Sequence, residues 1–165
     1  MRSSALLLLV VVLLPAATHA QAAQAPRPSC QAAEHRAFDF WIGEWRVTNP
    51  RGAVAGQSSI TAILDGCAIR EEWRGAGGSN GTSLNFYDRA RGAWTQTWID
   101  NTGQPLRLVG GVRAGRMVLE AGSGADLQRI TWTPIVRDSV RQRWERSTDG
   151  GRSWTVAFDG LYVRR

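Results

Sequence analysis

Residues 67–100 read CAIREEWRGAGGSNGTSLNFYDRARGAWTQTWID. Three runs in this stretch, 67–74, 82–88 and 93–100, alternate between apolar and polar residues and are rich in Trp, Thr, Ile and Tyr, which favour strands. Glycines and short polar residues separate the runs and form turns. Short strands with tight connections predict an antiparallel β-meander.

The same pattern continues on both sides of this stretch, with a turn signal about every ten residues. Further strands are predicted at 43–49, 57–64, 104–110, 115–121, 127–134, 139–146 and 153–164. No long helical period remains to cover a sheet, so a sheet of about ten strands must pack on itself. Closing it into a barrel removes its exposed edges. We therefore expect an all-β, up-and-down antiparallel barrel, with a β-sandwich as the alternative.

The first twenty residues have the form of a signal peptide. Arg2 precedes the apolar run ALLLLVVVLL at 5–14, and Pro15 and small residues follow up to Ala20. Ten apolar residues rise only about 15 Å as a helix, half the thickness of a bilayer core. We expect a signal peptide at 1–20, a disordered lead-in at 21–29 and a single domain at 30–165. The protein is then periplasmic or secreted, with no stable membrane insertion after cleavage.

The start of the domain combines a short helix and a cysteine. Gln31 to Arg36 are good helix formers, and Ser29 can cap a short helix that runs to Phe38. Export permits a disulfide between Cys30 and Cys67, the two cysteines of the chain. A pair of buried free thiols is the alternative.

Charge gives little indication of a macromolecular partner. The chain has 20 basic residues, all of them arginine, against 14 acidic ones, for a net charge of +6. Arginine binds phosphate well, so a polyanionic partner is conceivable. The arginines are scattered among acids, however, which is typical of a solvated face. No nucleic-acid-binding module is recognisable, and we expect no nucleic-acid partner.

One pattern predicts a pocket. Three strands carry Glu or Gln two residues before Trp, a spacing that puts both side chains on one face. Turn geometry adds further neighbours: Ile60 opposite Glu71, and Asn85 opposite Gln96. The predicted face gathers Glu71, Trp73, Asn85, Trp94, Gln96, Trp98, Gln142 and Trp144. Large apolar walls with a few polar groups are typical of small-molecule pockets. A filled core and an outward-facing surface are the alternatives.

Catalytic machinery is hard to find in the sequence. His35 is the single histidine after the signal peptide, and no His or Cys cluster has metal-binding spacing. There is no nucleophile elbow and no phosphate-binding loop. Glu71 is the one candidate acid or base, if burial raises its pKa. We expect neither a metal nor a cofactor, and whether the protein is an enzyme is left open, with a non-enzyme favoured.

Residues 38–45, FDFWIGEW, carry a resemblance to a known family. Gly43-x-Trp45 at the start of the first strand resembles the signature of calycins, the lipocalin-like barrels. In those barrels an arginine of the last strand covers a floor tryptophan, and here Arg164 matches that position. The stretch from Cys30 to Arg164 resembles exported bacterial lipocalin-like domains, which have no established activity. Haem-binding relatives use a late histidine, which this chain lacks, so the resemblance does not extend to haem.

A second local match concerns a turn. Residues 147–154, STDGGRSW, resemble the Asp-box hairpin of sialidase propellers, but the motif occurs only once here. A propeller needs several repeats. We therefore expect a turn shaped by Asp149 and its glycines, with Trp154 packed onto the core.

These observations favour an exported barrel that binds a small apolar or aromatic molecule. A structural or interaction domain of the cell envelope with a filled core is the alternative. A hydrolase or isomerase that uses Glu71 is a third possibility.

The apolar run after Arg2 predicts a mature amino terminus between Gln21 and Gln24. Amino-terminal sequencing of the exported protein tests this, and retention of Met1 would contradict it.

Overall fold

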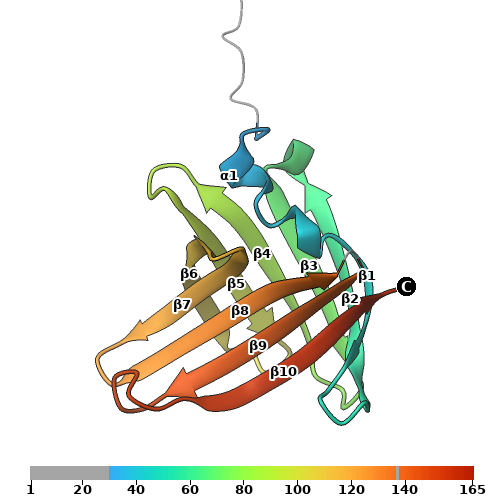
Figure 1. Ribbon diagram of the computed structural model, residues 1–165, viewed down its shortest axis with the longest axis vertical. Coiled ribbons are helices and arrows are strands. Elements are labelled where there is room, and N and C mark those ends of the chain that lie inside the picture. Colours follow the sequence, from blue (N-terminus) through green and yellow to red (C-terminus); the bar gives the residue numbers. More distant parts are fainter. Residues whose placement is uncertain (1–29, 137) are drawn as a thin grey trace, which may run out of the picture.

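The computed structural model describes residues 30–136 and 138–165, which form a closed antiparallel barrel (Figure 1). The predicted signal peptide and lead-in lie outside the described residues. Each strand pairs with its sequence neighbours, and the first strand pairs with the last. The strands are β1 (Gly43–Thr48), β2 (Val54–Ile63), β3 (Ala68–Gly75), β4 (Asn80–Asp88), β5 (Ala93–Asp100), β6 (Pro105–Arg113), β7 (Arg116–Ser123), β8 (Asp126–Val136), β9 (Ser139–Ser147) and β10 (Thr155–Arg164).

The predicted all-β barrel is confirmed, and the alternative sandwich is wrong. The observed strand ends differ from the predicted ones by three residues or fewer. Strand positions can be predicted from the alternation of apolar and polar residues, because only one face of each strand packs into the barrel interior.

A short helical segment covers one end of the barrel (Figure 1). It consists of α1 (Ala33–Arg36) and the 3-10 turn η1 (Asp39–Trp41). The helix is thus shorter than the expected 31–38 segment, and its first turn has no side-chain cap. No described helix has the length and apolar character needed to cross a membrane.

The predicted disulfide is confirmed. Cys30 is bonded to Cys67, which follows the 3-10 turn η2 (Leu64–Gly66) between β2 and β3. The bond ties the beginning of the domain to the rim of the barrel next to α1. Because the bond joins residues far apart in the chain, it removes conformational entropy from the unfolded state, an effect of about 4 kcal/mol for a loop of this length.

Aromatic side chains fill the barrel under the helical segment. Phe38 stacks on Trp41 with a centroid distance of 4.9 Å and meets Trp132 edge-on at 5.1 Å and Trp94 edge-on at 5.6 Å. All four are buried, and together with buried Trp45 they form the aromatic floor of the barrel. This end of the barrel therefore has a filled core.

Trp45 is held at the junction of β1 and β10. It is fully buried, and the guanidinium carbon of Arg164 lies 4.5 Å from its ring centroid. Arg164 also donates to the carbonyl of Ile42 at 3.2 Å. A Cβ on Gly43 would come 2.1 Å from an Arg164 nitrogen, so only glycine leaves room for the guanidinium. The contact expected from the Gly-x-Trp opening is present.

The 147–154 hairpin forms as a turn, but the expected place of Trp154 is wrong. Ser147 accepts hydrogen bonds from the amides of Asp149 and Gly151, and Asp149 accepts one from the amide of Ser153. Trp154 lies outside the aromatic core, with the guanidinium carbon of Arg129 4.2 Å from its ring centroid. Arg129 points to the outer face of β8, where it pairs with Glu145. Because Trp154 stacks on this arginine, its ring lies on the outer face and does not reach the core.

We expect Trp45→Ala to lower the free energy of unfolding by about 3–5 kcal/mol, because it deletes a fully buried aromatic side chain. Arg164→Ala removes the cation–π contact, the hydrogen bond to Ile42 and an exposed ion pair with Asp138, and should cost about 1–2 kcal/mol. Urea unfolding measures both, and a Trp45→Ala effect no larger than that of Arg164→Ala would contradict the role of the floor.

Candidate functional site

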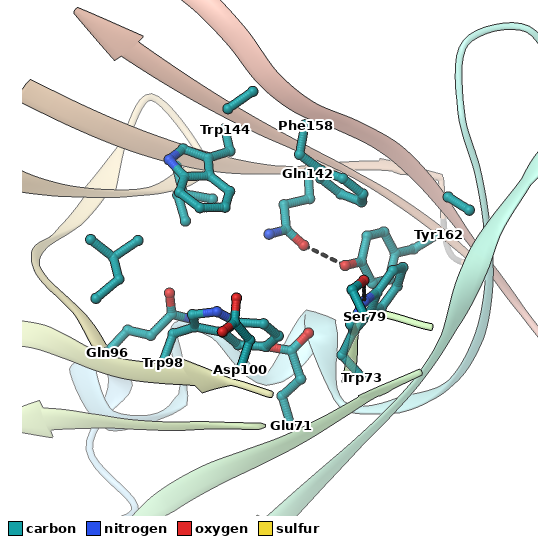
Figure 2. A pocket seen from close by; sticks show the side chains of 14 residues that line it. Glu71, Trp73, Ser79, Gln96, Trp98, Asp100, Gln142, Trp144, Phe158 and Tyr162 are labelled. Atoms are coloured by element: carbon teal, nitrogen blue, oxygen red, sulfur yellow. Dashed lines mark hydrogen bonds between the residues drawn. The ribbon is translucent and has the colours of Figure 1, made fainter. Parts of the chain in front are cut away.

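A cavity of about 400 Å³ occupies the half of the barrel away from α1 (Figure 2). Its walls come from the ends of the strands that lead into the β3–β4, β5–β6 and β9–β10 loops. The lining residues are Ala55, Glu71, Trp73, Ser79, Gln96, Trp98, Asp100, Leu106, Ile130, Gln142, Trp144, Ala157, Phe158 and Tyr162. The interior is thus divided into a filled aromatic floor next to α1 and an open chamber at the opposite end of the barrel.

Six of the eight predicted pocket residues line this cavity. They are Glu71, Trp73, Gln96, Trp98, Gln142 and Trp144. The predicted registers are present: Ile60 pairs with Glu71, and Asn85 pairs with Gln96. The two hairpins set these pairs, and the pairing of Glu71 with Ser83 between β3 and β4 relates one hairpin to the other.

The other two predicted residues lie elsewhere. Asn85 is fully buried beneath the cavity and supports Gln96 instead of lining the space. Trp94 belongs to the aromatic floor, and its indole nitrogen donates to the carbonyl of Glu34 at 2.9 Å. Both face inward as predicted, but they lie closer to the helical segment than the cavity does. Period-two alternation gives the face of a side chain and not its depth in the barrel.

Glu71 is the buried end of a hydrogen-bonded chain. Gln96 donates to Asn85 at 2.7 Å, Asn85 donates to Ser83 at 2.9 Å, and Ser83 donates to a Glu71 carboxylate oxygen at 2.8 Å. Ser58 donates to the other carboxylate oxygen at 3.2 Å. The chain orients the carboxylate from both sides and satisfies the buried polar groups below it.

Burial dominates the protonation of Glu71. Removal of the carboxylate from water raises its pKa to about 7, and the hydrogen bonds from Ser83 and Ser58 oppose that rise. The neighbouring Tyr162 donates from its hydroxyl to Gln142 Oε1. Burial, followed by the charge of Glu71, raises the pKa of Tyr162 well above its usual range. Glu71 therefore changes charge near neutral pH, while Tyr162 stays protonated.

No model of a known protein family matches this chain, and no curated protein matches it in a sequence search.

Two glycines make room for the tryptophans of the cavity wall. A Cβ on Gly56 would come 2.7 Å from the ring of Trp73, and a Cβ on Gly81 would come 2.4 Å from the ring of Trp98. Each ring therefore covers a glycine of a neighbouring strand. In both hairpins a strand with Gly-x-Ser pairs with a strand that carries Glu/Gln-x-Trp, and the serine lies directly opposite the tryptophan: Ser58 opposite Trp73, and Ser83 opposite Trp98. The serines of both segments donate to Glu71.

The pocket predicted from the sequence omits three lining residues that period-two alternation places on the inner face of their strands. Asp100 follows Trp98 by two residues on β5, so the same alternation places it on the same face. Phe158 and Tyr162 precede Arg164 on β10 by even spacings, and Arg164 covers the floor tryptophan. Extending each strand's inner face in both directions would have placed all three side chains inside the barrel, but not at the depth of the cavity.

The chemistry available in the cavity is limited. No group of three His, Cys, Asp or Glu within 30–136 and 138–165 can hold a metal. His35 lies on α1, outside the cavity lining, where it accepts a hydrogen bond from Arg89 at 2.9 Å. The cavity thus offers aromatic surface, amides, hydroxyls and carboxyl groups, and no histidine or thiol among the residues that line it.

The raised pKa of Glu71 predicts a pH-dependent stability. Because the folded-state pKa is about 7 against a usual 4.5, the stability gained by protonation is full below pH 4.5 and is lost as the pH rises through 7. Glu71→Gln removes this titration. The unfolding free energy of the variant minus that of the wild type should therefore rise by about 3 kcal/mol between pH 4 and pH 8.

Glu72→Gln is the matched control, because Glu72 is the next residue of the strand and is half-exposed beside Arg70. Its effect should stay within about 1 kcal/mol over the same range, as expected for a surface ion pair. Urea unfolding at several pH values measures both variants. An equal pH dependence for Glu71→Gln and wild type would contradict the burial argument.

Proposed function

We propose that this protein is an exported lipocalin-like barrel that binds a small apolar or aromatic molecule in its interior. The observation that carries the proposal is the cavity of about 400 Å³ with aromatic walls and few polar groups. Small-molecule sites have volumes of about 300–1,000 Å³ and this composition.

The contrast between the two halves of the barrel favours binding over a purely structural role. In the floor, tryptophans and Phe38 contact one another and leave the core filled. A structural domain would gain stability from the same packing throughout. In the half of the barrel away from α1, Gln96 and Gln142 instead face a space between aromatic walls (Figure 2). Each amide makes one hydrogen bond within the protein, through Gln96 Nε2 and Gln142 Oε1, and its other polar atom is left to water or a ligand in this space.

Export forms part of the proposal. The apolar run after Arg2 supports it, and so does the Cys30–Cys67 disulfide, since such bonds persist in oxidising compartments. The contact between Arg164 and Trp45 supports the proposed relation to calycins.

Catalysis is a second candidate, favoured by one observation. Glu71 lies in the cavity with a pKa of about 7, which suits an acid or base at neutral pH. Among the lining residues, however, only Asp100 and Tyr162 could titrate beside it. The pKa of Asp100 is lowered by hydrogen bonds from Thr102, and that of Tyr162 is far too high for neutral pH. The one serine of the lining, Ser79, accepts a hydrogen bond from the indole nitrogen of Trp73 at 3.4 Å instead of donating to a base, so we favour binding.

A neutral fluorescent probe, N-phenyl-1-naphthylamine, tests the proposal. We expect the wild-type protein to bind it with quenching of tryptophan emission, because Trp73, Trp98 and Trp144 line the cavity. Trp98→Ala and Gln96→Leu should change the affinity several-fold while both proteins stay folded by circular dichroism.

Trp154→Ala is the matched control, since this tryptophan stacks beside Arg129 outside the cavity lining. It should leave the affinity unchanged. Absence of probe binding, or equal effects of Trp98→Ala and Trp154→Ala, would overturn the proposal. Native mass spectrometry of protein purified from its own host then identifies a ligand that copurifies.

A further inference from the structure

The charge of the cavity is opposite to that of the whole protein. Basic residues outnumber acidic ones by 20 to 14 in the sequence. Among the cavity-lining residues that the structure describes, however, the ionisable groups are Glu71, Asp100 and Tyr162, and none is basic. Hydrogen bonds from Thr102 lower the pKa of Asp100, so this carboxylate is charged at neutral pH. A positive protein thus surrounds a chamber whose charged groups are negative.

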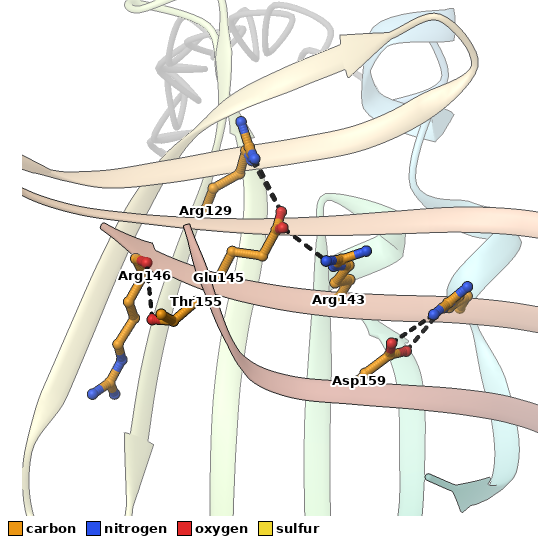
Figure 3. Close-up of polar contacts among 7 residues, drawn as sticks. Arg129, Arg143, Glu145, Arg146, Thr155 and Asp159 are labelled. Atoms are coloured by element: carbon orange, nitrogen blue, oxygen red, sulfur yellow. Dashed lines mark hydrogen bonds and ion pairs between the residues drawn. The ribbon is translucent and has the colours of Figure 1, made fainter. Parts of the chain in front are cut away.

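The arginines of the neighbouring strands pair on the outer face (Figure 3). Glu145 accepts Arg129 at 3.0 Å and Arg143 at 3.2 Å, and Arg141 donates to Asp159 at 2.8 Å. The inner positions of β9 between these arginines are Gln142 and Trp144. Because side chains alternate across a strand, Arg141 and Arg143 face away from the chamber, whereas Arg146 shares a face with Gln142 and Trp144.

The walls of the chamber suit a cation. Trp73, Trp98, Trp144, Phe158 and Tyr162 all line it, and the faces of aromatic rings attract positive charge. One of these rings already holds a cation: the guanidinium carbon of Arg146 lies 4.7 Å from the ring centroid of Trp144. Arg146 is exposed and is not among the lining residues, so it lies at the edge of the chamber.

Glu71 supplies a second carboxyl group in the chamber, and it is negatively charged above about pH 7. Its carboxylate accepts from Ser58 at 3.2 Å and from Ser83 at 2.8 Å, which orients both oxygens. A carboxylate can accept about four hydrogen bonds, so two remain for a bound donor. A buried carboxylate without a cationic partner is costly, and a ligand with an ammonium group would offset this cost.

We infer that the ligand is an organic cation, an amine or ammonium compound with an apolar or aromatic body, whose charge pairs with Glu71 between the aromatic walls. This inference rests on the proposed binding function and specifies its ligand class. Asp100, the last residue of β5, adds a second carboxylate to the lining of the chamber. The glycines under Trp73 and Trp98 keep these rings against the wall and leave the centre of the chamber to the ligand.

Three small compounds with the same phenyl group test the inference: 2-phenylethylammonium, neutral 2-phenylethanol and anionic 3-phenylpropanoate. Each competes with N-phenyl-1-naphthylamine at pH 8, where Glu71 is mainly ionised. We expect the ammonium compound to bind at least about tenfold more tightly than the alcohol, the size of one desolvated cation–aromatic or ion-pair contact. The anion should bind most weakly.

Two variants locate the effect. Glu71→Gln should remove most of the preference for the ammonium compound and change the alcohol's affinity by less than about threefold. Arg146→Gln should strengthen binding of the ammonium compound, since it removes a competing cation from the Trp144 ring.

Each contrary outcome has a distinct meaning. Equal affinities for the ammonium compound and the alcohol overturn the cation inference and leave the proposed function standing. Tighter binding of the anion, weakened by Arg146→Gln, overturns it in favour of an anionic ligand held at the mouth. Displacement of the probe by none of the three compounds also overturns it, and failure of the probe itself to bind overturns the proposed function as well.

Discussion

Pairing of β1 with β10 is the constraint on which the rest of the structure depends. Trp45 lies opposite Arg164 in this pairing, and the guanidinium covers the indole at 4.5 Å. Closure leaves the sheet without a free edge and separates an inside from an outside for every strand. In an open sheet the same side chains would all meet water, and neither the floor nor the chamber would exist.

The closed interior is used in two ways. Next to the helical segment, large rings fill the space with few polar atoms. Farther along the barrel, each of two tryptophans covers a glycine on the neighbouring strand, and the centre stays open. The Gln96–Asn85–Ser83–Glu71 chain separates the two regions. It pairs the buried polar groups at the boundary, so the polar base of the chamber does not destabilise the apolar floor.

The separation of charge follows from the same alternation. On β9 the arginines 141 and 143 alternate with Gln142 and Trp144, so one set faces water and the other the chamber. The outer arginines gain carboxylate partners, and each exposed pair contributes little stability. Their larger effect is that none of the described residues that line the chamber is basic, and the nearest guanidinium described, that of Arg146, lies on the ring of Trp144. The outer face therefore carries most of the basic groups, while the interior keeps its own electrostatic character.

The sequence by itself determined the all-β class, the strand positions to within three residues, the disulfide and the inward side of the Glu/Gln-x-Trp strands. Each of these depends on local alternation, on short turns or on the number of cysteines, and all three can be read from the sequence. Only the tertiary structure decided that Asn85 and Trp94 lie below the cavity, that Trp154 stacks outside the core, and that Asp100, Phe158 and Tyr162 complete the lining. These outcomes depend on depth along the barrel and on strand tilt. Depth is set when all ten strands close together, because closure couples the register of each pair to every other pair.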